Sequence, residues 1–283
     1  MMFCDALRLL RVVRPLEEYR YVGFGHWQFV DFELMRRQLG IRSMVSIERD
    51  TLNQDRFEEN NPFAEIELVF GDSSEVLPDL DMGPPTVAWL DYTARLNAVA
   101  LSDLRLLAHG LPAGSVVAAT FNCHPGKEDQ RLDALRLAVG DDVVPGDLSE
   151  EDLDWRGLPR VQRRILAEQL AAAAHPRDPS ARIQQFMFLR YAETAPMMFW
   201  AALIVDETVE ELLRQARLSS LEQFRDGDEL LEITVPWLST REVIALNEQI
   251  RAGQVPEAKG LERKDCGAYA RLHRWYPPVP LPF

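Results

Sequence analysis

The chain has 283 residues, of which 47% are hydrophobic, so it is long enough to bury the core of a globular protein. Its formal net charge of −14 opposes non-specific binding to the phosphate backbone of nucleic acids. No apolar run approaches the roughly 20 residues that a membrane-spanning helix requires, so no membrane partner is expected.

The basic clusters, the cysteines and the N-terminal segment indicate the class of protein further. Two basic clusters, "RGLPRVQRR" at 156–164 and "RLHRW" at 271–275, are interpreted first as solvated faces, with a nucleic-acid patch as the weaker alternative. Cys4, Cys123 and Cys266 are scattered and form no CxxC pair, which argues against a disulfide framework or a zinc site. The first 15 residues lack the long apolar core of a signal peptide and predict an amphipathic helix. We therefore expect a reduced, cytoplasmic protein.

Strand and helix patterns alternate through the first 125 residues. Apolar runs predict strands at 21–25, 42–48, 66–72, 84–92 and 115–123. Amphipathic or polar runs between them predict helices at 26–40, from 51 to a break at 60–62, and at 96–114 with an end near Gly110. Such alternation predicts parallel strands with crossover helices, and hence a doubly wound α/β sheet.

The second half of the chain follows a different pattern. Residues 126–182 predict helices, including an insertion at about 145–182 that begins with a capping pattern at Ser149. The runs "ARIQQFMFLRYAET" and "PMMFWAALIVDE" predict an antiparallel hairpin with its turn near Thr194. A helix at 208–218, a strand within 226–238 and a helix opened by the capping box Ser239–Glu242 complete the pattern, before a proline-rich tail. We expect two domains, 1–207 and a C-terminal extension, 208–283.

Five parallel strands closed by an antiparallel hairpin resemble class I S-adenosyl-L-methionine (SAM)-dependent methyltransferases, over residues 19–207. "YVGFG" is similar to the first glycine-containing motif of that family, "SIE" to the acidic end of its second strand, "VFGDSSEVLPDLD" to a segment of many O-methyltransferases and "VAWLDY" to its fourth-strand motif. A closer likeness is to uncharacterised bacterial proteins described as O-methyltransferases. The resemblance implies a mostly parallel, seven-stranded Rossmann-like sheet, SAM as cofactor, and methyl transfer to a hydroxyl or another nucleophilic atom of an acceptor that stays unidentified.

Physical arguments give roles to the residues at the predicted strand ends. Gly23 and Gly25 let the backbone approach a ligand where a Cβ would collide. A helix that begins near His26 would point free N–H groups at a carboxylate. Glu48 stands where a carboxylate can accept hydrogen bonds from both ribose hydroxyls. The full predicted cofactor-binding set is Gly23, Phe24, Gly25, His26, Glu48, Arg49, Asp72, Ser73 and Asp91.

The third and fourth strand ends supply the adenine contacts and the catalytic candidates. Asp72 can accept a hydrogen bond from an adenine amino group, and the Ser73 N–H can donate to a ring nitrogen. Asp91 and Tyr92 face the expected place of a methyl sulfonium, which a carboxylate or an aromatic ring suits. We therefore predict Asp91 and Tyr92 as the catalytic residues, ahead of the histidines at 26 and 124.

Each of these features has a simpler interpretation. Gly-Phe-Gly is more often a turn than a nucleotide site, and Asp72 could simply cap a helix. The acidic residue that precedes the glycines in the family is replaced by Tyr21 or Val22, and Trp27 stands in place of a third glycine. Asn122 has no preceding aspartate, so no metal site is expected.

Two other functions remain open at this point. A degenerate pocket would leave a non-catalytic Rossmann-like binding or assembly protein, which the missing third glycine and Trp27 favour. Gly-x-Gly followed by Glu48 also fits the adenosine ribose of an NAD(P)-dependent oxidoreductase, although the terminal hairpin argues against that class. The sequence leaves the oligomeric state open.

Overall fold

The computed structural model describes residues 2–175, 179–192 and 195–275. These residues form two compact units, one from Phe3 to Leu231 and a second from Glu232 onward, with which Met2 is grouped. The border between the units falls inside the last strand, β8 (Leu231–Ile233). The predicted turn at Thr194 and most of the predicted proline-rich tail lie outside the described residues. The division of the chain into domains 1–207 and 208–283 stays a prediction.

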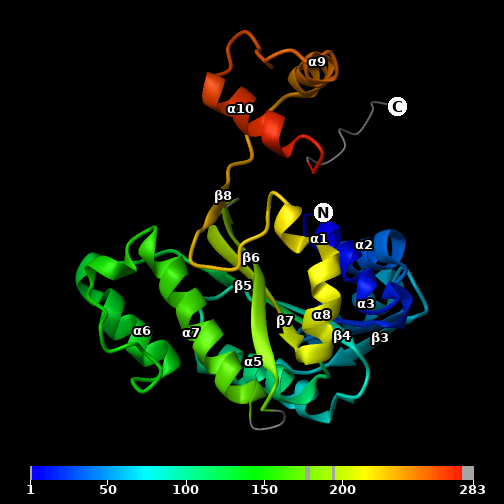
Figure 1. The fold of residues 1–283 in the computed structure, drawn as a ribbon, viewed down its shortest axis with the longest axis vertical. Coiled ribbons are helices and arrows are strands. Elements are labelled where there is room, and N and C mark those ends of the chain that lie inside the picture. Colours follow the sequence, from blue (N-terminus) through cyan, green and yellow to red (C-terminus); the bar gives the residue numbers. More distant parts are fainter. Residues whose placement is uncertain (1, 176–178, 193–194, 276–283) are drawn as a thin grey trace. The chain divides into compact units, whose positions relative to one another are not determined.

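The larger unit is built on a single mixed sheet (Figure 1). Its strand order is β3-β2-β1-β4-β5-β7-β6-β8, and neighbouring strands among the first five are parallel. β7 pairs antiparallel with both β5 and β6, so the predicted terminal hairpin is confirmed. The strand bounds are β1 (Arg20–Phe24), β2 (Ser43–Glu48), β3 (Ile66–Phe70), β4 (Thr86–Asp91), β5 (Val116–Asn122), β6 (Arg182–Ala192) and β7 (Pro196–Val205). The doubly wound α/β fold is therefore confirmed, with the short β8 as an eighth strand.

Helices cover both faces of this sheet (Figure 1). Successive side chains of a strand point to opposite faces, so Val22 of β1 joins the core with α5 and α7 while Tyr21 packs on Phe32 of α2, with ring centroids 4.9 Å apart. Phe3 of α1 packs on the same second face, 5.2 Å from Phe199. The helices are α1 (Met2–Leu9), α2 (Val30–Leu39), α3 (Gln54–Asn60), α4 (Ser73–Val76), α5 (Ala98–Gly110), α6 (Arg131–Val139), α7 (Gly157–Ala174) and α8 (Glu207–Ala216).

The start of α2 corrects one prediction. The helix begins at Val30, not near His26, and its N-terminal flanking residue Phe29 has a left-handed φ of 49°. The Phe29 N–H donates to the carbonyl oxygen of His26, so residues 26–29 form a turn between β1 and the helix. Gly40 ends the helix as predicted, with a φ of 76° that favours glycine. The prediction of a helix that begins near His26 is therefore wrong.

The C-terminal unit contains two helices, α9 (Thr240–Arg251) and α10 (Arg263–Leu272). The predicted capping box is confirmed, because the Ser239 side chain accepts from the Glu242 N–H and the Glu242 carboxylate accepts from the Ser239 N–H. α10 was not predicted. A small core holds the two helices together; its buried members are Val243, Leu246, Cys266 and Tyr269.

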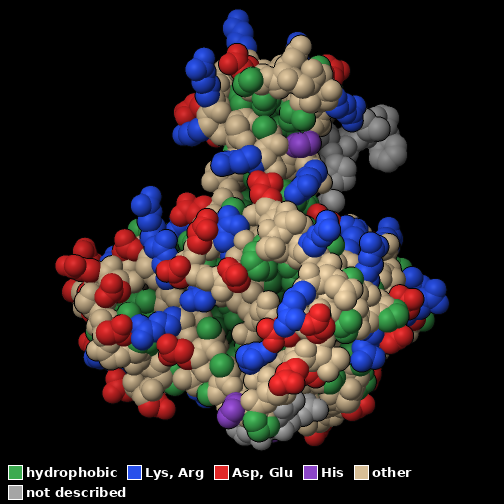
Figure 2. Space-filling view, in the orientation of Figure 1, with side chains coloured by type: hydrophobic (Ala, Val, Ile, Leu, Met, Phe, Trp, Pro, Cys, Tyr) green, Lys and Arg blue, Asp and Glu red, His purple; other side chains and the backbone are tan. Residues whose placement is uncertain are grey.

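Charges on the larger unit are largely mixed in sign. On the face that Figure 2 shows, acidic and basic side chains are interspersed. In the basic cluster at 156–164, Arg164 forms ion pairs with Asp147 at 2.9 Å and with Glu168 at 3.0 Å. That arginine is therefore engaged within the protein itself.

Candidate functional site

The carboxyl ends of the five parallel strands meet at one edge of the sheet, the edge at which open α/β sheets bind ligands. Glu48 and Asp91 are the last residues of β2 and β4, and Asp72 precedes α4 just beyond β3. Gly25 and Tyr92 come directly after β1 and β4. The fold therefore places the predicted residues at this edge.

The glycine segment lies directly against the buried carboxylate of Glu48. A Cβ added to Gly25 would overlap Glu48 Oε1 and Ser46 Oγ, and would lie 2.8 Å from Glu48 Cδ. At Gly23 a Cβ would lie 2.7 Å from the hydroxyl oxygen of Tyr21. Both glycines are therefore required by close approach, and the contact joins the ends of β1 and β2.

Glu48 is nearly inaccessible, with 3% of its surface exposed. The Ser46 hydroxyl donates to Glu48 Oε1 at 2.7 Å. Burial raises the pKa of Glu48 to about 7, an effect that the Ser46 hydrogen bond opposes and that the nearby Asp31 carboxylate reinforces. A buried carboxylate at the end of a parallel strand is suited to a ligand that brings hydroxyl donors.

A second carboxylate near the glycines comes from α2. The Tyr21 hydroxyl donates to Asp31 Oδ2 at 2.5 Å. Burial raises the pKa of Asp31 to about 6, and Asp91 acts on it in the same direction. Asp31 interacts electrostatically with the buried Glu48 and the exposed Asp91, and we call these three carboxylates the acidic cluster. Tyr21 stands at or next to the position of the family's acidic residue. Its hydroxyl group fixes the carboxylate of Asp31, which comes from α2.

Sequence reasoning missed Asp31, because in "VDFELMRRQL" it looks like an ordinary acidic residue of the first helical turn. The only local signal was the absence of an acidic residue at the Tyr21 position.

Another buried carboxylate, Asp103 of α5, links two predicted site residues. Asp103 Oδ2 accepts from the Ser73 hydroxyl at 2.6 Å and from the Tyr92 hydroxyl at 2.8 Å. Burial raises the pKa of Asp103, and the two hydrogen bonds oppose that rise. Sequence reasoning missed this residue too, since it lies inside a helix with no motif.

The ring of Tyr92 is fixed by two neighbouring aromatic side chains. It stacks on Phe121 with centroids 5.3 Å apart, and Phe24 meets it edge-on at 5.0 Å. Burial, reinforced by the Asp103 charge, raises the pKa of Tyr92 far above its ordinary value. Tyr92 therefore keeps its proton at neutral pH.

The remaining predicted residues are less enclosed. Asp72 is exposed and makes no side-chain cap of α4. Arg49 and His26 are also exposed, and His26 Nδ1 accepts from the Gln28 N–H at 3.3 Å. The Trp27 ring is covered by the guanidinium of Arg56, 3.9 Å from the ring centroid.

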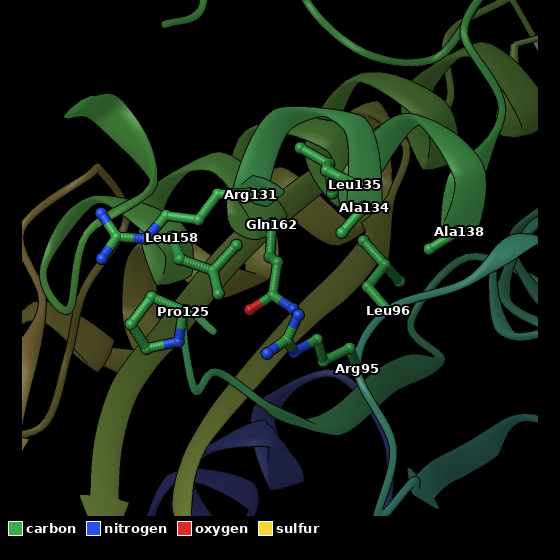
Figure 3. Close-up of a pocket in the computed structure, with 9 residues that line it drawn as sticks. All are labelled: Arg95, Leu96, Pro125, Arg131, Ala134, Leu135, Ala138, Leu158 and Gln162. Atoms are coloured by element: carbon green, nitrogen blue, oxygen red, sulfur yellow. The ribbon is translucent and has the colours of Figure 1, made fainter. Parts of the chain in front are cut away.

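A small hollow opens between the loops that follow β4 and β5 and the helices α6 and α7 (Figure 3). Asn122 at the end of β5 ties these loops together, because its N–H donates to the carbonyl oxygen of Ala94 at 3.0 Å. The hollow begins at Arg95, three residues after Tyr92, and so lies at the same edge of the sheet as the predicted site.

Two further findings concern the described part of the chain only. It contains no group of three or more His, Cys, Asp or Glu side chains arranged to hold a metal ion. None of its helices is both long and apolar enough to cross a membrane.

Comparison with protein families identifies the chain. A family described as "Putative O-methyltransferase" matches residues 1–279, almost the whole length. The chain belongs to this family. The predicted membership of an O-methyltransferase family is thereby confirmed.

Solved structures similar to this O-methyltransferase family member are distant in sequence. Trm1 from Pyrococcus horikoshii, solved with S-adenosyl-L-methionine, is 11% identical, with a TM-score of 0.47 over 75% of this chain. This chain spans 57% of the Trm1 chain. A "putative O-methyltransferase" from Klebsiella pneumoniae is 17% identical, with a TM-score of 0.39 over 71% of this chain and 80% of its own. No curated protein matches the sequence.

Proposed function

We propose that the protein transfers a methyl group from SAM to an oxygen atom of its acceptor, at the edge of the sheet that carries Glu48 and Gly25. The observation that supports this most directly is the contact between the two residues, since a side chain at position 25 would overlap the Glu48 carboxylate. A bare backbone beside a buried acceptor fits the ribose of an adenosyl group, whose two hydroxyls are donors.

The acidic cluster gives the site a charge that suits this cofactor. SAM carries an ammonium and a sulfonium group, and Asp31, Glu48 and Asp91 concentrate negative charge near the glycines. Asp31 supplies the carboxylate that the family motif would place at position 21. We assign Glu48 to the ribose and Asp31 to the ammonium group.

The other predicted residues receive roles that match their surroundings. Asp72 and Ser73 are assigned to the adenine, with the Ser73 side chain fixed by Asp103. Phe24 and Tyr92 present aromatic surface, because their rings pack on each other. Gly23 lies in β1 and His26 in the turn after it, and the exposed Arg49 follows Glu48 in the chain.

SAM, when bound, supplies a methyl group that the positive sulfur makes electrophilic. The protein must then align the acceptor oxygen with that methyl group and receive the proton of the acceptor hydroxyl. Asp91 is the carboxylate that we assign to the proton, because Tyr92 keeps its own. Tyr92 is accordingly assigned to positioning rather than to proton transfer.

Isothermal titration with S-adenosylhomocysteine tests the cofactor site. The wild-type protein is expected to bind it, and Glu48→Gln to bind at least about tenfold more weakly, since a charged acceptor is lost. Glu67→Gln is the matched control, because Glu67 lies on β3 and is exposed. Binding that is equal in all three proteins would contradict the role of Glu48.

Two outcomes would favour the alternatives. Binding of NADH without binding of S-adenosylhomocysteine would indicate an oxidoreductase. Tight cofactor binding with no methyl transfer to any acceptor would indicate a binding protein. Trp27 favours that function, because its ring lies under the Arg56 guanidinium, close to the glycines in the chain.

We also propose a cytoplasmic location. Cys4, Cys123 and Cys266 are all free thiols in the structure, which fits a reducing compartment. Labelling of the denatured protein with a thiol reagent immediately after cell lysis would test this, and any disulfide found there would contradict it.

A further inference from the structure

The C-terminal unit differs in charge from the rest of the chain. From Glu232 to the end, the sequence contains seven Lys and Arg residues and six Asp and Glu residues, whereas the whole chain contains 31 and 45. The excess of acidic residues, which opposes binding to nucleic acids, therefore belongs to the larger unit.

One side of α10 concentrates the basic residues of this unit. At 3.6 residues per turn, four exposed basic positions fall within a sector of about 100° around the helix axis: Arg263, Lys264, Arg271 and Arg274. Arg274 follows the last helical turn, and the C-cap residue His273 keeps helical backbone angles, so the sector extends to it. We call these four residues the basic face. The cluster that the sequence shows at 271–275 forms one end of it.

The middle of the basic face is open. Gly267 lies within the same sector, is exposed and has nothing within 4 Å of an added Cβ. Asp265, the acidic residue of α10, lies on the other side of the helix. From Arg263 to Arg274 the face is about 16 Å long, which matches about five phosphates of a stacked strand.

The ion pairs on this face lie in water. Lys264 pairs with Glu262 at 2.8 Å, and Arg263 lies 3.9 Å from Glu257. Exposed pairs of this kind contribute little to stability, so both cations can exchange a carboxylate for a phosphate group.

The apolar side of α10 is already covered. Cys266 and Tyr269 are buried in the small core that the helix shares with α9. Beside the basic face the helix offers Ala268 and Ala270, rather than the large apolar side chains with which an amphipathic helix enters a lipid surface. A nucleic acid therefore suits this face better than an anionic membrane does.

Trp237 adds exposed aromatic surface to the same unit. It is 96% exposed, although the next residue, Leu238, packs against the small core of the unit. An exposed indole can stack on an unpaired base, and stacking combined with a positively charged surface is typical of proteins that bind single strands.

We propose that the C-terminal unit binds a single-stranded nucleic acid. The basic face of α10 contacts successive phosphates, and the Trp237 indole stacks on a base. RNA and DNA share this chemistry, so the experiment distinguishes them. The inference goes beyond the proposed function and does not depend on it, because phosphate binding by α10 requires no cofactor.

Fluorescence anisotropy with the full-length protein tests this inference. The probes are labelled single strands of RNA and of DNA of about 12 nucleotides, and a DNA duplex of the same length. A single strand is expected to bind more tightly than the duplex, and the tighter of the two strands identifies the sugar. Between about 50 and 200 mM NaCl, the logarithm of the binding constant should fall with a slope of about −3, since four phosphate contacts contribute about −0.7 each.

Gly267 allows the charge of the basic face to be changed in both directions. Gly267→Glu should weaken binding at least about fivefold, and Gly267→Lys should strengthen it about twofold or more, because no neighbour obstructs either side chain. Gly146→Glu and Gly146→Lys are the matched controls, since Gly146 is an equally open position in the larger unit. A side chain at position 267 favours the helix, so the variants should keep the wild-type melting temperature.

Two further variants separate phosphate contacts from base contacts. Arg271→Gln should make the salt slope shallower by about 0.7, whereas Arg164→Gln should not, because Arg164 is paired with Asp147 and Glu168. Trp237→Ala should weaken single-strand binding at least about fivefold and leave the salt slope unchanged.

Several results would overturn the inference. These are no binding to any oligonucleotide at the lowest salt, tighter binding to the duplex, and unchanged binding by Trp237→Ala. Equal effects of the substitutions at 267 and 146 would show a general effect of net charge. Binding to vesicles of phosphatidylserine and phosphatidylcholine but to no oligonucleotide would indicate a membrane partner instead. S-adenosylhomocysteine binding, measured on the same variants, should stay unchanged, so that failure here is distinguishable from failure of the proposed function.

Discussion

At the scale of single residues, the site depends on carboxylates that the fold has withdrawn from water. Glu48 and Asp31 both have raised pKa values because burial disfavours their charged forms. Neither faces a cationic side chain of the protein among the interactions that shift its pKa. Buried carboxylates without a cationic partner are typical of sites that bind a ligand with hydrogen-bond donors or positive charge.

Gly25→Ala tests the close approach at this site. The added Cβ must displace the Glu48 carboxylate, so we expect at least about tenfold weaker binding of S-adenosylhomocysteine and a loss of about 1–3 kcal/mol in the free energy of unfolding. Gly146→Ala is the matched control, since nothing lies within 4 Å of its added Cβ. Calorimetric titration and urea unfolding measure both effects, and equal behaviour of the two variants would refute the steric argument.

The pH dependence of Glu48 acts in opposite directions on stability and on binding. Its pKa of about 7 in the folded protein exceeds the ordinary value of 4.5, so the folded state gains protons more readily than the unfolded state. The free energy of unfolding should therefore rise as the pH falls from 8 toward 5, and this contribution is lost as the pH rises through about 7. Cofactor affinity should fall over the same range, because the neutral carboxyl is a weaker acceptor.

Glu48→Gln, which cannot titrate, is expected to flatten both profiles, whereas Glu67→Gln should leave them unchanged. Chemical unfolding and calorimetric titration at pH 5, 6, 7 and 8 measure the two profiles. A Glu48→Gln protein with the wild-type pH profiles would show that other groups, such as Asp31, dominate.

At the scale of secondary-structure elements, hydrogen bonds to Asp103 join α5 to the start of α4 and to the residue after β4. Its carboxylate accepts from Ser73 at the start of α4 and from Tyr92 just after β4. A single helical residue thus fixes both an adenine-contacting candidate and the aromatic wall of the site. This arrangement makes α5 a support for the site as well as a cover for the sheet.

Asp103→Ala should lower the free energy of unfolding by about 1–3 kcal/mol, because two hydroxyl donors lose their acceptor. Tyr92→Phe should cost about 0.5–1.5 kcal/mol, since it removes only one of the bonds. In a double-mutant cycle measured by urea unfolding, Asp103→Ala should cost less in the Tyr92→Phe background. Strictly additive costs would mean that the hydrogen bond contributes nothing to stability.

At the scale of the whole molecule, the two compact units differ greatly in the size of their cores. The larger unit has a continuous core that includes strands β1, β2, β4, β5, β6 and β7. In the described part of the C-terminal unit, four buried residues form the core cluster. Small cores rarely offset the conformational entropy of folding.

A chain that ends after Leu231 should therefore unfold cooperatively and bind S-adenosylhomocysteine as the full chain does. Residues 232–283 alone should lack cooperative unfolding. Thermal unfolding followed by circular dichroism, together with calorimetric titration, checks both expectations. Loss of cofactor binding in the shortened chain would assign the C-terminal unit a part in the site.

The sequence by itself determined the strand order along the chain, the terminal hairpin and the strand-end residues. Apolar runs, glycines and acidic residues at strand ends are local patterns, and short-range sterics and hydrogen bonding set them. Gly25 and Glu48 were found in this way. The start of α2 was misplaced, because His26 and Phe29 form a turn that carries no sequence signal beyond the apolar spacing.

Only the tertiary structure decided which helical side chains reach the site. Asp31 meets Tyr21, Asp103 meets Ser73 and Tyr92, and Gln162 meets Asn122 from a helix 40 residues further along the chain. These pairs form when helices pack across the sheet, and helical spacing fixes only which face of a helix is buried. Which partner that face meets depends on crossovers and packing, so the acidic cluster and the hollow could not be predicted from local sequence.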